Sequence, residues 1–201
     1  MKTKQKSKRL RSPITWFGGK GNMIAKLLPL LPDHHIYCEA FGGGASLLCA
    51  KPPSPVEVYN DLNQGLVNLF RVLRDRQLFS EFERLSQLTL VSREEHRDAI
   101  ANLNSGPSVE RAWRFFTSAR QSFAGHQRGS WGYIRRSSNR GMASSCSKWL
   151  STVDLLPELH QRWQRVQVDC DSWDRVLSRY DEVDTLFYLD PPYVSATRKG
   201  G

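Results

Sequence analysis

The sequence predicts an α/β protein in which a mostly parallel sheet is interrupted by a mainly helical insert. Three observations lead to this prediction. Short apolar runs typical of buried strands alternate with amphipathic helical patterns on both sides of residues 77–161. Several of these runs lead into an acidic residue or a glycine-rich turn. The positive charge gathers outside the strands, in the N-terminal tail and in the insert.

The first half of the chain contains two strand–helix units, separated by turn-forming residues. The expected elements, in chain order, are an amphipathic helix around Met23–Leu31, a strand over His35–Ala40 that runs into Gly42–Gly44, a helix over Ser46–Ala50 that Pro52–Pro55 ends, a strand over Val56–Tyr59, and a helix whose apolar positions recur from Leu62 to Leu73. Asn60 or Asp61 is expected to cap this last helix, because short polar side chains accept hydrogen bonds from a first helical turn.

The second half begins with the insert and returns to strands at its end. Residues 78–120 are expected to be mainly helical, with a break at Asn104–Pro107. Residues 121–148 lose apolar periodicity and are rich in glycine, serine and arginine, which indicates a loop or hairpin. A strand over Val166–Cys170, a helix over Trp173–Tyr180 and an apolar strand over Leu186–Leu189 follow.

Composition excludes several classes of protein. No apolar stretch in the 201 residues approaches the ~20 residues that a membrane-spanning helix needs. The four cysteines are scattered without CxxC spacing, which argues against a zinc site and a disulfide framework. None of the five histidines has ligand spacing with another donor. We therefore expect a cytoplasmic protein with reduced thiols and no metal.

The net charge of +9 is unevenly distributed. Residues 1–11 carry six basic residues and no acid, and residues 111–148 carry eight and no acid. The remaining residues sum to −5. Such clustering is typical of a protein that meets a polyanion, with residues 1–11 as a disordered basic tail.

An acidic residue lies at the carboxyl end of each of four predicted strands: Glu39, Asp61, Asp171 and Asp190. Ligands of parallel sheets bind at the carboxyl ends of the strands. Consecutive glycines after the first strand allow a close backbone approach to a ligand, and an acid one strand later can accept hydrogen bonds from ribose hydroxyls. This combination suits an adenosine-containing cofactor. A nicotinamide or flavin dinucleotide fits less well, since the third glycine of a pyrophosphate-binding loop is absent.

The tetrapeptide Asp190-Pro191-Pro192-Tyr193 follows a hydrophobic strand. The exocyclic amine of a nucleobase is a weak nucleophile, because its lone pair is delocalised into the ring. A carboxylate and a backbone carbonyl that accept its two N–H groups can draw the nitrogen toward tetrahedral geometry. The prolines hold this segment extended, and Tyr193 offers a flat face to a base extruded from a duplex. The pattern predicts transfer of a group to a base amine.

Four blocks together resemble the DNA adenine-N6 methyltransferases of the Dam type. They are Trp16-Phe17-Gly18-Gly19-Lys20, Glu39–Ser46, Asn60-Asp61-Leu62-Asn63 and Asp190–Tyr193, in the order of that family. The resemblance implies a Rossmann-like sheet of the AdoMet-dependent methyltransferases that carries an inserted, mainly helical target-recognition lobe. It also implies S-adenosyl-L-methionine (AdoMet) as methyl donor, double-stranded DNA as partner and direct methyl transfer to N6 of adenine. A monomer is expected.

The resemblance also assigns roles to residues. The cofactor would be held by Trp16 and Lys20 at its methionine end, by the loop residues Glu39, Phe41 and Gly43, by Asp61 at the ribose, by Asp171 at the adenine, and by Asp190. Asp190 and the Pro191 carbonyl, with Pro192 and Tyr193, would orient the target adenine. DNA would be contacted by residues of the insert: Arg120, His126, Arg128, Trp131, Tyr133, Arg135, Arg136 and Arg140. Residues 124–131 do not reproduce the GATC-reading segment of the family, so that specificity is not carried over.

These assignments divide the chain into a basic tail (residues 1–11), a catalytic domain (12–76 and 162–201) and a target-recognition insert (77–161). Only eight residues follow Tyr193, where the family continues with further strands. We therefore expect a sheet that is incomplete at its C-terminal side, and an inactive fragment is one hypothesis. Two alternatives stay open: a DNA-binding module with an inert catalytic half, and a different adenosine-cofactor enzyme. The target sequence and the role in restriction–modification, phage self-protection or DNA marking stay open as well.

Overall fold

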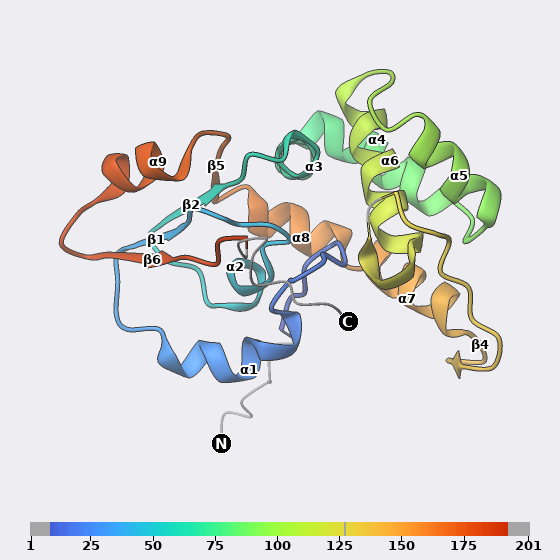
Figure 1. Cartoon of the computed structure of the whole chain (residues 1–201), viewed down its shortest axis with the longest axis horizontal. Helices are drawn as coiled ribbons and strands as arrows, with labels where there is room; N and C mark the ends of the chain where they lie inside the picture. Colours follow the sequence, from blue (N-terminus) through green and yellow to red (C-terminus); the bar gives the residue numbers. More distant parts are fainter. Residues whose placement is uncertain (1–8, 127, 193–201) are drawn as a thin grey trace.

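A computed structural model describes residues 9–126 and 128–192. At its centre lies a four-stranded sheet in which all neighbours are parallel (Figure 1). The strands, in sheet order, are β5 (Gln167–Asp169), β2 (Val56–Asn60), β1 (Ile36–Glu39) and β6 (Thr185–Tyr188). The register pairs Glu39 with both Tyr59 and Tyr188, so the carboxyl ends of these strands lie level. The predicted α/β fold with a parallel sheet is confirmed.

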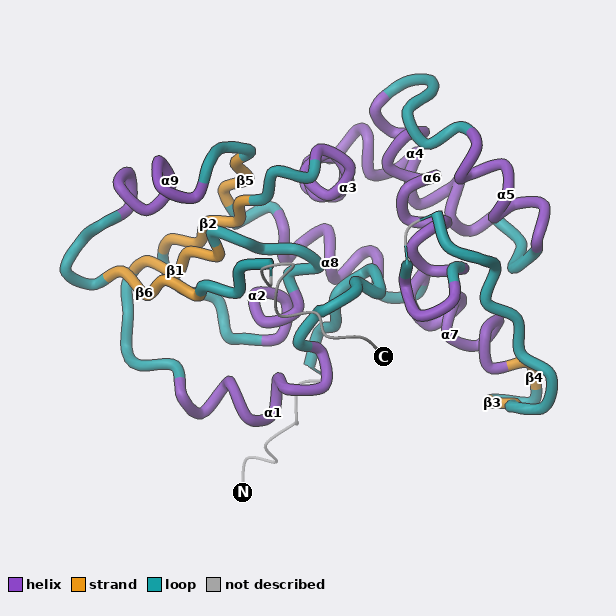
Figure 2. The backbone as a smooth tube through the Cα atoms, in the orientation of Figure 1, coloured by secondary structure: helices purple, strands orange, loops and turns teal. Residues whose placement is uncertain are grey.

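Helices pack on both faces of this sheet, and the alternation of side chains along the strands explains why. Tyr37 and Tyr59 point into the larger core cluster, which includes buried residues of α2 (Ser46–Ala50), α3 (Gln64–Arg74) and α8 (Leu156–Trp163). Cys38 and Val58, one position away, pack against Val176 of α9 (Trp173–Tyr180). Successive strand residues face opposite sides, so each face needs its own cover (Figure 2).

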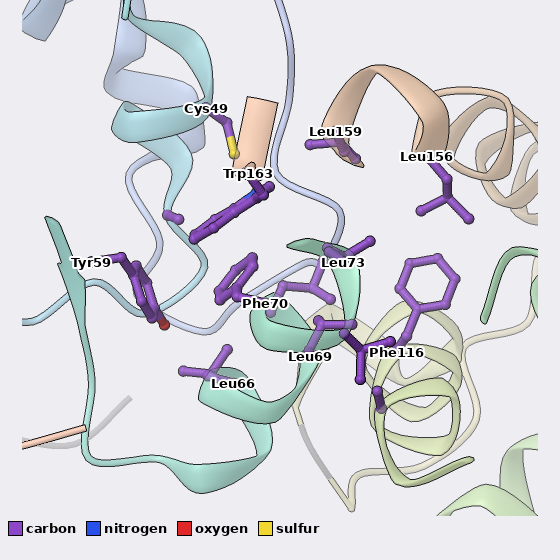
Figure 3. Packing of buried hydrophobic residues seen from close by; sticks show 14 of the residues in the cluster. Cys49, Tyr59, Leu66, Leu69, Phe70, Leu73, Phe116, Leu156, Leu159 and Trp163 are labelled. Atoms are coloured by element: carbon purple, nitrogen blue, oxygen red, sulfur yellow. The ribbon is translucent and has the colours of Figure 1, made fainter. Parts of the chain in front are cut away.

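Aromatic rings join the sheet to two of its helices (Figure 3). Phe70 of α3 stacks on Trp163 of α8 with ring centroids 3.9 Å apart. Tyr59 of β2 meets Phe70 edge-on at 4.7 Å and Trp163 at 5.3 Å. All three side chains are fully buried. Burial of rings this large stabilises the sheet half of the molecule and fixes where β2 ends.

A bundle of helices makes up most of the expected insert and shares the larger core cluster with the sheet (Figure 1). It contains α4 (Arg76–Leu88), α5 (Arg93–Ala101), α6 (Ser108–Gln121) and α7 (Ser144–Val153). Phe116 of α6 contacts both Phe82 of α4 and Trp149 of α7. The helical prediction for residues 78–120, with a break before Pro107, is confirmed.

Residues 122–143 connect α6 to α7 as an irregular segment, as expected. It holds a short 3-10 helix η3 (Phe123–Gly125), an isolated bridge between Ser122 and Trp131, and a small hairpin of β3 (Ser138–Asn139) and β4 (Met142–Ala143). The expectation of loop up to residue 148 is wrong at its end, because α7 already begins at Ser144.

The helix expected around Met23–Leu31 is divided into η1 (Gly21–Met23), α1 (Ile24–Leu27) and η2 (Leu28–Leu30). Pro29 has no backbone N–H and therefore cannot continue an α-helical ladder. The predicted cap of α3 is also wrong. Asn63 caps this helix, and its side chain accepts hydrogen bonds from the backbone N–H groups of Gly65 and Leu66. Asn60 and Asp61 are engaged elsewhere, as described below.

Among the residues that the structure describes, no helix is both long and apolar enough to cross a membrane. The same residues contain no group of three or more potential side-chain metal ligands. All four cysteines are free thiols. Burial raises the pKa of Cys38 and of Cys49 to about 12, so these two thiols act as small apolar core residues.

Candidate functional site

The parallel order of the strands brings the predicted acidic residues to one edge of the sheet. Across that edge the loops after β5, β2, β1 and β6 carry, in turn, Asp171, Asp61, the glycine loop and Asp190. A polar ligand at this edge therefore meets residues from four distant parts of the chain. The structure brings together what the sequence predicted to converge.

The glycine loop after β1 is fixed to the end of β2. The N–H of Gly42 donates to the Asn60 carbonyl over 2.8 Å, and the N–H of Gly43 donates to Oδ2 of Asp61 over 2.8 Å. The Tyr59 hydroxyl donates to the Gly43 carbonyl, also over 2.8 Å. A Cβ at Gly42 would lie 2.2 Å from the Tyr59 ring. Only glycine fits here, because Tyr59 is buried and cannot retreat.

Asp61 combines a structural role with free acceptor capacity. Its Oδ2 accepts from Gly43 and its Oδ1 accepts from the backbone N–H of Asn63 over 2.8 Å. A carboxylate oxygen has two lone pairs, so each oxygen can accept one further hydrogen bond. The residue is partly exposed. It is therefore held in place and still able to bind a pair of neighbouring hydroxyl groups.

Asp171 is connected to Asp61 through Asn60, a residue whose role the sequence did not reveal. The Asn60 side chain donates to the carbonyls of Ala40 and Asp171 over 2.9 Å each and accepts from the Asp171 N–H over 2.9 Å. The pKa of the Asp171 carboxyl is lowered by the backbone N–H of Ser172 and by Arg179. Asp171 thus stays ionised. The adjacency of Asn60 to Asp61 is the one available signal, and the pattern around it favours a helix cap instead.

Glu39 lies beneath the glycine loop and is only 1% exposed. Its Oε1 accepts from the Tyr37 hydroxyl over 2.7 Å and from the Leu48 N–H at the start of α2 over 2.8 Å. Burial raises the pKa of Glu39 to about 7, an effect that these two hydrogen bonds oppose. In this geometry Glu39 supports the loop and the helix behind it, and the protein itself covers its carboxyl group.

Trp16 and Lys20 approach the same edge from the N-terminal segment. The Trp16 ring lies against the glycine loop, with its Cδ1 3.1 Å from the position of a Cβ on Gly43. Lys20 Nζ lies 2.6 Å and 2.8 Å from the two carboxylate oxygens of Asp190 and donates to the Gly18 carbonyl over 3.0 Å. An ion pair at the edge thus joins two predicted site residues that are 170 positions apart.

Two exposed apolar side chains flank the acids, and the sequence did not assign either of them to the site. Leu62, which follows Asp61, is 67% exposed, so its expected place on the buried face of a helix is wrong. Trp173 follows Asp171 by two residues and is 50% exposed. Its ring lies 6.2 Å from that of Phe41 in the glycine loop. Apolar surface beside hydrogen-bonding carboxylates suits a planar heterocycle attached to a sugar.

Most of the residues predicted to contact DNA lie on the exposed surface of the connecting segment. Tyr133 stacks on Trp131 at 5.9 Å, and the Arg135 guanidinium lies 5.6 Å from the Tyr133 ring centre. His126 packs against Phe17 of the N-terminal segment at 4.5 Å. The exposed basic residues here are Arg128, Arg135, Arg136 and Arg140.

Arg120 differs from this group in having partners within the protein, and its contact with DNA stays a prediction. Its guanidinium donates to Thr15 Oγ1 over 3.3 Å and to the Lys148 carbonyl over 3.2 Å. Burial lowers its pKa to about 10. Arg120 therefore ties α6 to α7 and to the N-terminal segment. Pro191 and Pro192 are exposed next to Asp190, and Tyr193 lies outside the described residues.

Comparison with known proteins adds to this geometry. Residues 16–199 match the profile of the family described as D12 class N6 adenine-specific DNA methyltransferase. The chain is also 30% identical over 132 residues to the Type II methyltransferase M1.LlaDCHI of Lactococcus lactis subsp. cremoris, which corresponds to 60% of this chain and 45% of that protein. The match therefore spans less than half of that relative's length. The family match includes all four blocks singled out in the sequence.

Proposed function

Because the chain belongs to the D12 class N6 adenine-specific DNA methyltransferase family, we propose that it transfers a methyl group from AdoMet to N6 of adenine in double-stranded DNA. The observation that carries this proposal is the convergence of Asp61, Asp171 and Asp190 with a fixed glycine loop at one edge of a parallel sheet.

The residues at the edge fit AdoMet. Asp61 has a free lone pair on each oxygen for the ribose hydroxyls, and Asp171 lies beside the apolar surfaces that suit the adenine ring. The loop residues Gly43 and Phe41, together with Trp16, would line the site between these two acids and Asp190. Lys20 adds a positive charge next to Asp190. Glu39 acts from below by holding the loop. When bound, AdoMet supplies an electrophilic sulfonium methyl, and no metal is part of the proposal.

Asp190 and Pro191 prepare the target amine. The carboxylate accepts one N–H of adenine N6 and the Pro191 carbonyl accepts the other, which localises the nitrogen lone pair. Bound AdoMet would supply its methyl group to this nitrogen and keep the bonding electrons on its sulfur. The amine nitrogen then loses one proton, which Asp190 can accept and pass to solvent. Tyr193, with Pro192 before it, would stack on the extruded base.

The helical lobe is proposed to hold the DNA. We assign residues 77–161 to target recognition and residues 12–76 with 162–201 to the catalytic domain, as in enzymes of the Dam type. Helix α8 begins within the first range but packs Trp163 onto the sheet, so it connects the two parts. His126, Trp131 and Tyr133 are proposed to meet DNA along with four arginines: Arg128, Arg135, Arg136 and Arg140. The name of the lactococcal relative, a Type II methyltransferase, supports methyl transfer.

Transfer of labelled methyl groups from AdoMet to duplex DNA tests this function. We expect N6-methyladenine in the hydrolysed product, and a loss of about a hundredfold to a thousandfold in Asp190→Ala, since one polar contact to the reacting group is removed. Asp181→Ala, at the exposed end of α9, is the matched control. Label in cytosine, or DNA binding without any incorporation, would contradict the proposal. Sequencing of the methylated DNA then identifies the target site.

A further inference from the structure

The ammonium group of Lys20 forms an ion pair with the carboxylate of Asp190, the group that the target amine needs. Nζ bridges the two oxygens of Asp190 at 2.6 Å and 2.8 Å. The side chains of Lys20 and Asp190 are only 22% and 27% exposed, so the pair is partly withdrawn from water. Partial withdrawal strengthens the attraction relative to a surface ion pair.

This arrangement conflicts with the chemistry proposed for Asp190. A cation that bridges both oxygens uses the lone pairs on the outward side of the carboxylate, whereas the remaining lone pairs point back toward the chain. An adenine amine needs one of the outward positions. Lys20 must therefore give up at least one oxygen before the base can bind.

The backbone of Lys20 is fixed, so the side chain has to move. The Lys20 carbonyl accepts from the Met23 N–H over 2.8 Å, and the Gly19 N–H donates to the Trp16 carbonyl over 3.0 Å. The Trp16 ring in turn lies against Gly43. The four-carbon stem of a lysine can swing its charge to another partner at little cost. A ligand held at this edge that carries a carboxylate would offer such a partner.

We propose that the ion pair between Lys20 and Asp190 blocks the target amine until a cofactor with an anionic amino-acid end takes the ammonium. This inference rests on the proposed function and deepens it, because it makes base binding depend on prior cofactor binding. Lys20 is then a positioning residue that acts through Asp190. It leaves the carboxylate before methyl transfer and contributes nothing to the transfer step itself.

The fluorescence of 2-aminopurine placed next to the target adenine of a duplex tests the proposal, because this base brightens when its stacking neighbour leaves the helix and the target itself keeps its N6 amine. With the wild-type chain we expect little signal without cofactor and an increase of about fivefold with S-adenosylhomocysteine. 5′-Methylthioadenosine, which lacks the amino-acid end, should give no increase. Lys20→Met should give the full signal without cofactor and bind the duplex about threefold to tenfold more tightly. Lys20→Arg, which keeps the pair, should behave like the wild type.

Lys26→Met is the matched control, because Lys26 is an exposed lysine on α1. In Lys20→Met, KM for DNA should fall while KM for AdoMet rises, because the variant loses both the block on Asp190 and the partner of the cofactor's carboxylate. The proposal is overturned if Lys20→Met needs cofactor as the wild type does, or if methylthioadenosine alone opens the wild-type site. A wild-type chain that methylates DNA while Lys20→Met fails these tests would overturn the inference and leave the function intact. A wild-type chain that neither binds nor methylates DNA would overturn both.

Discussion

The carboxyl edge of the sheet and the basic segment from Arg128 to Gly141 differ in how firmly they are held. At the edge, side chains and backbone of separate strands are joined by short hydrogen bonds, such as those of Asn60 and Asp61. In the basic segment most side chains are exposed, and among the described residues Arg140 donates one hydrogen bond, to Ser151. The difference indicates that chemistry needs a fixed geometry, whereas contact with a long polyanion needs accessible charge.

The largest effect that separates the two regions is expected for Gly42→Ala. The added methyl would lie 2.2 Å from the Tyr59 ring, which is fully buried and bonded to the loop through its hydroxyl. We expect a loss of about 3 kcal/mol or more in the free energy of unfolding, since overpacked cores strain their neighbours. AdoMet binding, measured by calorimetry on the folded fraction, should weaken at least tenfold, because the displaced loop would lose contacts to the cofactor.

Gly21→Ala provides the control for this prediction. Gly21 has no atom within 4 Å of the position of an added Cβ and lies at the start of an exposed 3-10 helix. Its substitution should change the free energy of unfolding by less than about 0.5 kcal/mol. Equal stability of the two variants would show that the contact between Gly42 and Tyr59 does not define the loop.

A second prediction concerns the pH dependence of the edge. The pKa of Glu39 is raised from 4.5 to about 7 by burial. The folded protein therefore holds a proton on Glu39 that the unfolded chain releases, so this stabilisation is complete below pH 4.5 and is lost as the pH rises through about 7. Glu39→Gln keeps the neutral form at every pH. It should exceed the wild type by up to about 3 kcal/mol at pH 8 and match it near pH 4.5.

Urea unfolding of both proteins between pH 4.5 and pH 9 measures this difference, with the m-values as a check that the unfolded states are alike. Two stability curves that run parallel across the range would mean that Glu39 is ionised in the folded protein at neutral pH. The basic segment contains no acidic residue and is expected to add nothing to the effect.

The sequence predicted the edge of the sheet well because its signals are local. An apolar run, a glycine turn and an acid follow one another within a few residues, and the parallel topology then places all carboxyl ends together. The positions of Asp61 and Asp171 at this edge therefore follow from the sequence alone. What local patterns cannot show is which atom binds which. The bridge that Asn60 makes to Asp171 joins residues 111 positions apart.

The errors have the same physical origin. Leu62 fits a helical apolar pattern, but Asn63 captures the first N–H groups of α3 and leaves Leu62 in the loop before it. The contact of Arg120 with Thr15, whatever its part in DNA binding, was likewise not visible in the sequence, because it joins the end of α6 to the N-terminal segment. Burial that depends on the packing of three separate elements leaves no mark in a window of a few residues.

A third prediction separates the two kinds of arginine. Arg120→Ala removes hydrogen bonds to Thr15 and to the Lys148 carbonyl, and it should lower the free energy of unfolding by about 1–2 kcal/mol. Arg136→Ala removes an exposed charge, so stability should stay within about 0.5 kcal/mol while DNA affinity falls severalfold. For this variant, the slope of the logarithm of the DNA-binding constant against the logarithm of the salt concentration should also be shallower by about one unit.

Thermal unfolding and DNA binding at two salt concentrations would measure both variants. Arg84→Ala, an exposed arginine of α4 that pairs with Glu81, serves as the control for charge alone. If Arg120→Ala weakened DNA binding without loss of stability, Arg120 would belong to the DNA-contacting group after all.

The smallest effect is expected in the basic segment itself, at the turn between β3 and β4. Gly141 adopts φ +75°, a left-handed conformation in which an added Cβ meets no atom within 4 Å. The cost of Gly141→Ala is therefore conformational only, about 1 kcal/mol, and Gly141→Asn should cost less because asparagine tolerates this region. Hydrogen exchange of the amides in β3 and β4 measures it. Since the hairpin is joined to the rest of the molecule by few contacts, most of this cost should appear as local opening, whereas the cost of Gly42→Ala should appear in global unfolding. A fall in global stability for Gly141→Ala as large as that for Gly42→Ala would show that the hairpin is as firmly integrated as the edge of the sheet.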